Sequence, residues 1–237
     1  MRRMPRARRV DYPGAIHHVG TRGNLGTAIV FDDDDRHHLL RLVSRACEHY
    51  DLECGAYCLM TTHYHLILRS RAGRISRGMA MLNGWFARWI NAKYERRGHI
   101  FGARFFNRVM EDGGYRREVA RYLPLNPVRA GLVHQPERWP WSSYAAMVGV
   151  RRPPAFLSGF VVDEWFDGNA NGYRAWVQAG GTTKDACLGA LFEGYDRPTA
   201  VRFAMQSHDI GLPCIARFLG VSERTVWRWL QTATMAG

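Results

Sequence analysis

The first half of the chain switches between two hydrophobic periods. Four short runs have the alternation or β-forming residues typical of strands: residues 15–20, 53–60, 63–69 and 105–110. Three segments repeat apolar residues at helical spacing: Leu39 to Tyr50, Ile75 to Ile90, and Tyr115 to about Leu123. The order βαββαβ followed by a helix predicts an α+β fold, a ferredoxin-like split βαβ sandwich in which helices cover one face of an antiparallel sheet.

The C-terminal residues have a different pattern. Leu212 to Gly220 predicts a short helix with a glycine turn, and Glu223 to Gln231 predicts a second helix capped by Ser222. This is the pattern of an all-α helix-turn-helix. The region between the two patterns is rich in Pro, Gly and aromatic residues and has no secure periodicity. We therefore expect three parts: a domain over 1–150, a linker or extension over 151–198, and a helix-turn-helix segment over 199–237.

Two clusters resemble metal sites but have simpler explanations. The aspartates Asp32 to Asp35 stand directly before a predicted helix, where carboxylates cap free amides and complement the helix dipole. Five scattered cysteines suit neither a disulfide framework nor a zinc ribbon. We expect Cys54 and Cys58, four residues apart, to be buried thiols.

Charge narrows the choice of partner. The formal net charge is +12 and the isoelectric point is near 10.0, which favours an anionic partner, with nucleic acid as the first candidate. The alternative is a basic protein whose charge serves only its solubility. The sequence has no apolar run of membrane-spanning length and no signal core after its basic N-terminus, so we expect no membrane partner and a cytoplasmic, nucleoid-associated location.

The third strand carries the chemistry. His63 and His65 stand two residues apart, so their side chains project from the same face and can share one cation. Mn²⁺ accepts imidazole more readily than Mg²⁺, which prefers oxygen. A pair of this kind can also simply face solvent on an edge strand, and spacing alone leaves that alternative open.

Tyr122 and Asn126 stand four residues apart and would share one face of a helix. Asn126 offers an amide oxygen as a third ligand. Tyr122 is a candidate nucleophile, although a free phenol has a pKa of about 10 and needs a base or a metal to react at neutral pH. The alternative is a core aromatic. A paired-histidine metal site beside a tyrosine would suit cleavage of a nucleic-acid strand through a covalent phosphotyrosine.

A family resemblance adds to this interpretation. The segments from Tyr12 to Asn24 and from Ala56 to His65 resemble the REP-associated tyrosine transposases, which are HUH single-tyrosine transposases. The similarity covers about the first 150 residues. It continues through Leu82-Asn83-Gly84, Arg97 to Phe101, Arg121 to Val133, and Trp139 to Tyr144.

The resemblance implies a function and roles for individual residues. It makes His63 and His65 the metal ligands, Tyr122 the nucleophile and Asn126 a third ligand or positioning amide. It implies cleavage of single-stranded DNA with a 5′-phosphotyrosine intermediate, near hairpins formed by palindromic repeats. The chain departs from the family pattern at Tyr64 between the histidines, at Asn126 where relatives often have glutamine, and at Pro124, which removes a backbone donor.

The remaining candidates concern DNA contact. Single strands are held by positive charge and by stacking on aromatics, for which we consider Arg22, Arg104, Arg108 and Arg129 with Phe101 and Phe105. Arg224, Thr225 and Arg228 would face duplex DNA if the last helix reads a groove. The sequence thus predicts a Mg²⁺- or Mn²⁺-dependent transposase, monomeric or homodimeric. The alternatives are a regulator that binds DNA without cleaving it and a nuclease in which water attacks.

Overall fold

The computed structural model describes residues 9–180, 197–207 and 210–235. These residues divide into two compact units, one from Val10 to Ala179 and one formed by the C-terminal residues after it. The predicted basic cluster at Arg2 to Arg8 and Cys187 lie outside the described residues. Each unit is described by itself.

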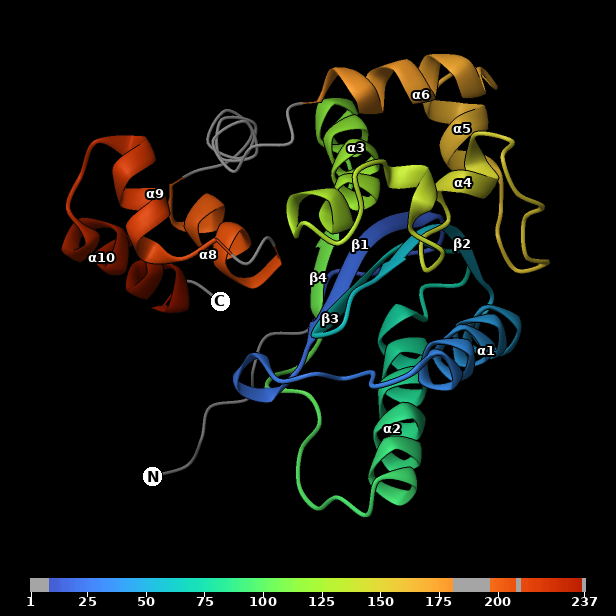
Figure 1. Ribbon diagram of the computed structural model, residues 1–237, viewed down its shortest axis with the longest axis horizontal. Helices are drawn as coiled ribbons and strands as arrows, with labels where there is room; N and C mark the ends of the chain where they lie inside the picture. The colour runs from blue at the N-terminus through green and yellow to red at the C-terminus, as the bar shows by residue number, and fades with distance from the viewer. Residues whose placement is uncertain (1–8, 181–196, 208–209, 236–237) are drawn as a thin grey trace. The chain divides into compact units, whose positions relative to one another are not determined.

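The first unit is built on a four-stranded antiparallel sheet (Figure 1). Its strands are β1 (Ala15–Arg22), β2 (Leu52–Leu59), β3 (His63–Ser70) and β4 (Phe106–Val109). The spatial order is β2-β3-β1-β4, with the hairpin partner β3 inserted between β1 and β2. This order is that of a split βαβ sandwich, so the predicted fold class is confirmed.

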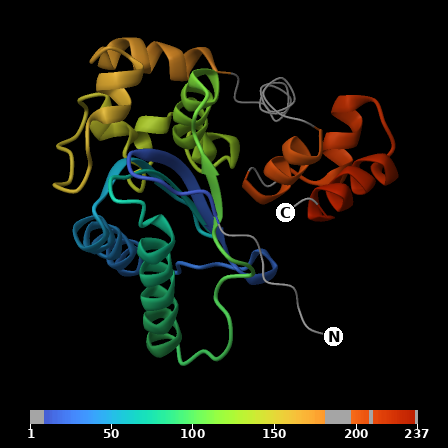
Figure 2. The ribbon, with the colours of Figure 1, turned by 180° about the vertical axis from the view of Figure 1, so that it is seen from behind.

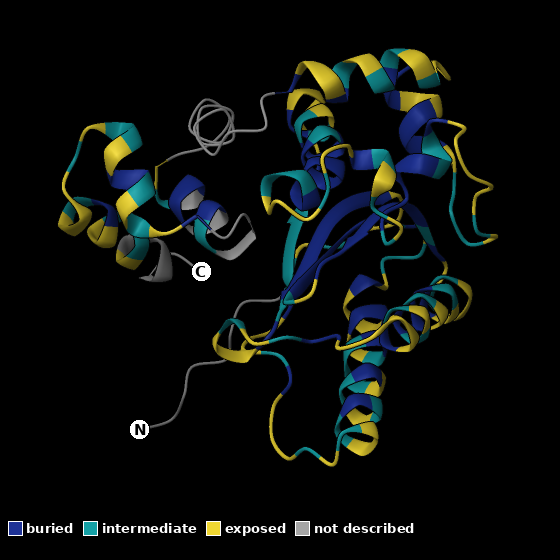
Figure 3. Cartoon of the chain, in the orientation of Figure 1, coloured by how far each residue is buried: buried dark blue, intermediate teal, exposed yellow. Residues whose placement is uncertain are grey.

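Helices cover both faces of this sheet, two on one face and one on the other. Helices α1 (Asp33–Tyr50) and α2 (Ile75–Lys93) pack on one face, where Val19, Leu66 and Phe86 belong to the apolar core. Helix α3 (Gly113–Arg129) lies over the opposite face, as both views of the ribbon show (Figures 1 and 2). Because of this second cover, β1, β2 and β3 are buried almost throughout, whereas the edge strand β4 is half-buried (Figure 3). We expected helices on one face only, since the strand pattern does not reveal a second cover.

The acidic run has the capping role predicted for it. The side chain of Asp32 accepts a hydrogen bond from the backbone amide of Asp35 at 2.8 Å, and the side chain of Asp35 accepts one from the backbone amide of Asp32. Together these two bonds form a capping box. Lys93 of α2 pairs with Asp32, Asp34 and Asp35 and holds the two helices together at this end. The thiols of Cys54 and Cys58 are buried, as predicted.

The outer edge of β2 is covered by the tryptophan- and serine-rich segment that follows α3. Leu59 donates its amide to the carbonyl of Trp141 at 2.9 Å and accepts from the indole of Trp139 at 3.0 Å. Ser143 accepts from the amide of Tyr57 at 3.0 Å and donates its own amide to the Tyr57 carbonyl at 3.0 Å. These bonds use the backbone groups that an edge strand would otherwise leave unpaired.

The first unit also contains the short helices η1 (Asn24–Gly26), η2 (Pro136–Arg138) and α4 (Tyr144–Met147). Beyond the predicted boundary at residue 150 it continues with α5 (Phe160–Trp165) and α6 (Ala170–Ala179). Residues 151–179 therefore form an extension of the compact unit that contains the sheet. Throughout the described part of the chain, every helix falls short of the length and apolar character that crossing a membrane requires.

Helix α3 continues through Pro124 and Pro127 without ending at either of them. Pro124 has no amide to donate to the carbonyl of Ala120 one turn earlier. The hydroxyl of Tyr173, from α6, donates to that carbonyl instead, at 2.8 Å. The extension thus supplies the hydrogen bond that the helix itself lacks.

The second unit contains α8 (Arg197–Ser207), α9 (Leu212–Leu219) and α10 (Glu223–Met235). Gly220 ends α9 in the left-handed conformation, with φ 63°, which favours glycine. The Ser222 hydroxyl accepts from the amide of Thr225 at 3.2 Å and so caps α10. Val226 is buried. Two helices joined by a glycine turn are therefore present where the sequence predicted them.

Replacing Tyr173 with Phe tests the bond to Ala120. The buried carbonyl would lose its donor, so we expect the free energy of unfolding to fall by about 1–3 kcal/mol. Tyr144→Phe is the matched control, because its hydroxyl is buried and has no hydrogen-bond partner among the described residues. Urea denaturation measures both, and equal effects of the two substitutions would contradict this account of Tyr173.

Candidate active site

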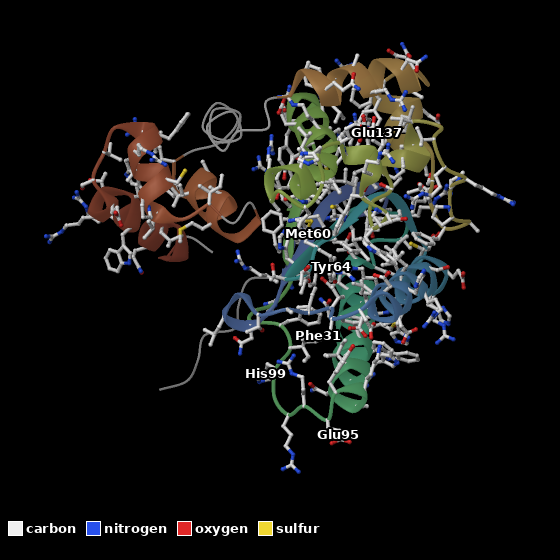
Figure 4. All side chains as sticks on the ribbon, viewed as in Figure 1. Phe31, Met60, Tyr64, Glu95, His99 and Glu137 are labelled. Carbon is white, nitrogen blue, oxygen red and sulfur yellow. The ribbon has the colours of Figure 1, made fainter. Side chains whose placement is uncertain are left out.

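The two histidines of β3 project from the face of the sheet that α3 covers. Their rings lie with centroids 5.3 Å apart. Tyr64, between them, points to the other face, where its hydroxyl donates to Asn83 of α2 at 2.5 Å (Figure 4). The departure from the family pattern at this position therefore places a second phenol in the core, away from the histidines.

The two ring nitrogens of His63 differ in their contacts. Its Nδ1 lies 3.0 Å from the hydroxyl of Thr62, whereas its Nε2 is buried and has no hydrogen-bond partner among the described residues. The side chain is 8% exposed. Burial, assisted by the positive charge of Arg22, lowers the pKa of His63 to about 4. The imidazole is therefore neutral near pH 7 and retains a lone pair that could bind a cation.

His65 is held from β1 by a residue that the sequence analysis did not select. His18 Nε2 lies 3.1 Å from His65 Nδ1, and His18 Nδ1 lies 3.1 Å from the hydroxyl of Tyr115 on α3. Burial holds the pKa of His18 well below its ordinary value. The alternation of β1 placed His18 on one face of the strand, but only the register with β3 brings it beside His65.

A glycine makes room for this contact. Gly20 is the register partner of His65 across the β1–β3 ladder. A Cβ atom at Gly20 would lie 2.9 Å from His65 Nδ1 and 3.3 Å from the backbone oxygen of Tyr64. The ring of His65 therefore lies over the strand at the one position without a side chain, which lets it reach His18.

Helix α3 turns one face toward the histidines. Tyr115, Val119, Tyr122 and Asn126 are spaced three or four residues apart and are all buried. The ring of Tyr122 meets that of His65 edge to face, with centroids 5.6 Å apart. Asn126 donates its amide to the carbonyl of Tyr122 at 3.4 Å. Pro124 does not disturb the shared face, and the candidate nucleophile lies beside a candidate metal ligand.

Three of the four arginines proposed for single-stranded DNA lie around this face. Arg129 lies over the ring of Tyr122 at 5.7 Å, and Arg108 of β4 lies over that of Tyr115 at 4.2 Å. Arg22 is the register partner of His63. Arg104 is exposed on the loop before β4.

The aromatic candidates for base stacking need correction. Phe105 is buried in the apolar core, and Phe101 is half-buried against Phe86, with ring centroids 6.3 Å apart. Phe105 in particular has no face to offer to a base. The sequence pattern did not separate these phenylalanines from exposed ones, because Phe105 only begins the short predicted strand 105–110 and Phe101 lies before that run.

In the second unit, the three residues proposed for duplex contact lie along α10. Arg224 and Arg228 are exposed, and Thr225 is half-buried. The hydroxyl of Thr225 lies 3.0 Å from that of Ser222 and accepts from Arg228 at 3.4 Å. Trp227, which the sequence analysis passed over, is also exposed on this helix.

The donor set fits a divalent cation, although it is small. Among the described residues, no group of three His, Cys, Asp or Glu side chains could hold a metal ion. His63 Nε2 is nevertheless a buried nitrogen without a partner, and His65 lies beside it. Two imidazoles with the amide oxygen of Asn126 as a third donor would suit Mn²⁺ better than Mg²⁺ and would leave positions open for other ligands.

Comparison with known proteins agrees with the sequence motifs. Residues 27–124 match the family model described as "Transposase IS200 like". A Haemophilus influenzae protein whose name describes it as a REP-associated tyrosine transposase is 27% identical over 111 residues. That alignment covers 42% of this chain and 63% of the relative's length. The resemblance stated from the motifs is thus confirmed.

The fold has also been seen in a solved structure. The structure of a REP-associated tyrosine transposase bound to a REP hairpin superposes with a TM-score of 0.53. The two chains are 19% identical, and the match covers 67% of this chain and 93% of the other. At this identity the similarity shows that the fold is shared.

Replacing Gly20 with Ala tests the packing of His65. The new methyl group would meet both the imidazole and the backbone of β3, so we expect a loss of about 1–3 kcal/mol in the free energy of unfolding. Gly113→Ala is the control, because it has open space around it at the start of α3. Thermal unfolding compares the two, and a neutral Gly20→Ala would contradict the close approach.

Proposed function

Because residues 27–124 match the IS200-like transposases, we propose that this chain is a DNA transposase. It cleaves single-stranded DNA and joins strand ends through a 5′-phosphotyrosine on Tyr122. The observation that carries the proposal is the contact of the Tyr122 ring with His65, next to Nε2 of His63, which has no hydrogen-bond partner in the part of the chain that the structure describes. A phenol and a pair of metal-binding imidazoles can then act on one phosphodiester.

In the proposed reaction Tyr122 is the nucleophile, and the histidines and Asn126 hold the metal ion. The hydroxyl of Tyr122 attacks the phosphorus and gives up its proton, the bond to the 3′ oxygen breaks, and the 3′ oxygen takes up a proton. A Mg²⁺ or Mn²⁺ ion held by His63, His65 and Asn126 would polarise the phosphate and stabilise the departing oxygen. Attack by a second 3′-hydroxyl reverses the step, joins a new strand and frees Tyr122. No ATP is needed, because the phosphotyrosine retains the energy of the broken bond.

The proposed substrate is a single strand beside a hairpin formed by a palindromic repeat. The name of the solved neighbour describes it as bound to a REP hairpin, and the net charge of +12 suits a nucleic-acid partner. Arg22, Arg108 and Arg129 are the arginines we propose to contact the DNA backbone near the site. Arg104 is a further, exposed candidate. Cytoplasmic action at the nucleoid, as a monomer or a homodimer, belongs to the same proposal.

We further propose that the C-terminal unit binds duplex DNA. The exposed side chains of Arg224 and Arg228 on α10 would contact the groove or its phosphates. The hydroxyl of Thr225 already contacts the Ser222 hydroxyl and the Arg228 side chain, so we give it a secondary part in base contact.

The decisive experiment is capture of the covalent adduct. Wild-type protein with Mn²⁺ and hairpin-bearing single-stranded DNA should form an adduct that denaturing electrophoresis resolves. We expect Tyr122→Phe to lower adduct formation at least about a thousandfold, as removal of a catalytic nucleophile does. EDTA should abolish the adduct, and added Mn²⁺ should restore it.

Tyr64→Phe is the matched control, because it removes a phenol from the same strand as the histidines but on the opposite face. It should retain the adduct. An adduct that persists in Tyr122→Phe would overturn the nucleophile assignment. Free cut ends without an adduct would indicate a hydrolytic nuclease, and bound but intact DNA would indicate a regulator that binds DNA without cleaving it.

The double substitution Arg224→Ala and Arg228→Ala tests the duplex proposal. If each arginine contacts one phosphate, duplex affinity should fall and the slope of log K against log salt should shrink by about 0.9 for each lost contact. Arg41→Ala with Arg45→Ala removes two exposed charges from α1 and serves as the control. Fluorescence anisotropy at several salt concentrations measures the duplex affinity of both variants. Equal losses of affinity in the two variants would show that only the net charge of the protein matters.

A further inference from the structure

Leu25 is the most exposed large apolar side chain in the described part of the chain. It lies in η1, the short helical turn that follows β1, and it is 96% exposed. Both views of the ribbon show this turn beyond the end of the sheet (Figures 1 and 2). A leucine has no hydrogen bond to offer through its side chain, so a partner at this position must present an apolar surface.

The backbone of Leu25 adopts a conformation that is rare for leucine. Its φ is 52° and its ψ is 25°, in the left-handed region that favours glycine and asparagine. The other non-glycine residues with positive φ in the described ranges are Asp51, Glu95 and Asp167, so Leu25 is the apolar one. Single exposed apolar side chains are common on protein surfaces. Leu25 differs from them because its backbone destabilises the fold, and a glycine in its place would avoid that cost.

Hydrogen bonds from neighbouring segments fix this turn. Gly23 donates its amide to the carbonyl of Thr62 at 2.8 Å, and Asn24 donates its amide to the carbonyl of Ile100 at 2.8 Å. Thr27 closes the turn, because its amide and its hydroxyl both donate to the carbonyl of Asn24, at 3.0 and 2.8 Å. The turn is therefore pre-organised, and it holds an apolar side chain at its tip.

The turn is attached beside the candidate metal ligands. Arg22, the last residue of β1, is the register partner of His63, and Thr62 directly precedes His63 on β3. A Cβ atom at Gly26 would lie 3.4 Å from Nη2 of Arg22, so the guanidinium lies against the turn. Leu25 follows Arg22 by three residues, which is at most about 11 Å along the chain. One DNA strand can therefore reach both the histidines and the turn.

We propose that Leu25 is an apolar wedge that packs against an unstacked base of the single-stranded DNA bound at this site. The inference rests on the proposed function, since the strand is the one on which Tyr122 would act. Bases present flat faces, and proteins that hold single strands combine contacts to these faces with positive charge along the backbone. Leucine is among the side chains that proteins insert between bases. Arg22 brings positive charge to the same turn.

A base fits this turn better than an apolar protein surface does. Protein docking surfaces present patches of several apolar side chains, whereas the residues exposed beside Leu25 are Asn24 and Thr27, which are polar. Polar side chains of this kind bond to phosphates and base edges. A single apolar tip among them matches the face of one base. Holding that base at a fixed distance from the histidines would limit sliding of the strand and so determine which phosphodiester lies at Tyr122.

A binding measurement tests the wedge without cleavage. Full-length protein in EDTA is titrated with a hairpin oligonucleotide that carries single-stranded flanks, and fluorescence anisotropy gives the affinity. Leu25→Asn removes the apolar side chain but suits the left-handed backbone. We expect its affinity for DNA to fall about 3- to 10-fold, while its melting temperature stays at or above that of the wild type.

Two further variants serve as matched controls. Leu25→Met keeps an apolar side chain of similar size and should retain most of the affinity. Val150→Asn removes an exposed apolar side chain from the segment after α4 and should bind as the wild type does.

The fluorescence of 2-aminopurine, placed at each flank position in turn, reports which base is unstacked. Binding of the wild type should brighten one flank position, and binding of Leu25→Asn should leave that position dim. Three results would each overturn the inference: unchanged affinity in Leu25→Asn, the absence of a brightened position in the wild type, or an equal loss of affinity for a hairpin without flanks.

The outcomes separate this inference from the proposed function. Formation of the Tyr122 adduct together with unchanged DNA affinity in Leu25→Asn would overturn the wedge and leave the transposase proposal standing. Binding to the flank that depends on Leu25, without any adduct at Tyr122, would support the wedge and count against the enzyme.

Discussion

The contact between helix α3 and the polar face of the sheet is the interaction on which the rest of the structure depends. A sheet covered on both faces is ordinarily apolar on both, yet here one covered face holds His18, His63 and His65. Burying these imidazoles is costly unless their nitrogens find partners. The bonds to Tyr115 and Thr62 provide such partners, and the nitrogen of His63 that remains is where a cation would bind.

The helix that completes this face is unusual in composition. Two prolines interrupt its backbone donors, and a residue of α6 compensates for the first of them. Tyr173 contacts the carbonyl that Pro124 leaves, and Trp176 donates its indole to the carbonyl of Arg117 at 3.1 Å. The segment after residue 150 thus contributes to the position of Tyr122 without lying in the site. This gives the extension a structural reason to be part of the same compact unit.

The sequence predicted much of the fold because its strands and helices differ in period. The strand order followed from the succession of elements, and the capping role of Asp32 and Asp35 followed from their place before a helix. His63, His65, Tyr122 and Asn126 could be selected because spacing within a single element decides which side chains share a face. Phe105 was misjudged because the short predicted strand 105–110 does not show which of its side chains face the core.

Spacing within an element is local, and so the sequence by itself determined the pair on β3, the pair on α3 and the glycine turn between α9 and α10. Three features depended on which elements meet, and only the tertiary structure decided them. They are the pairing of His18 with His65, the second helical cover of the sheet, and the bond from Tyr173 to α3. The physical reason is that strand register and helix packing bring together residues that are far apart in the chain. The periodicity within one strand or helix shows which of its side chains share a face, but it does not show which other element that face will contact.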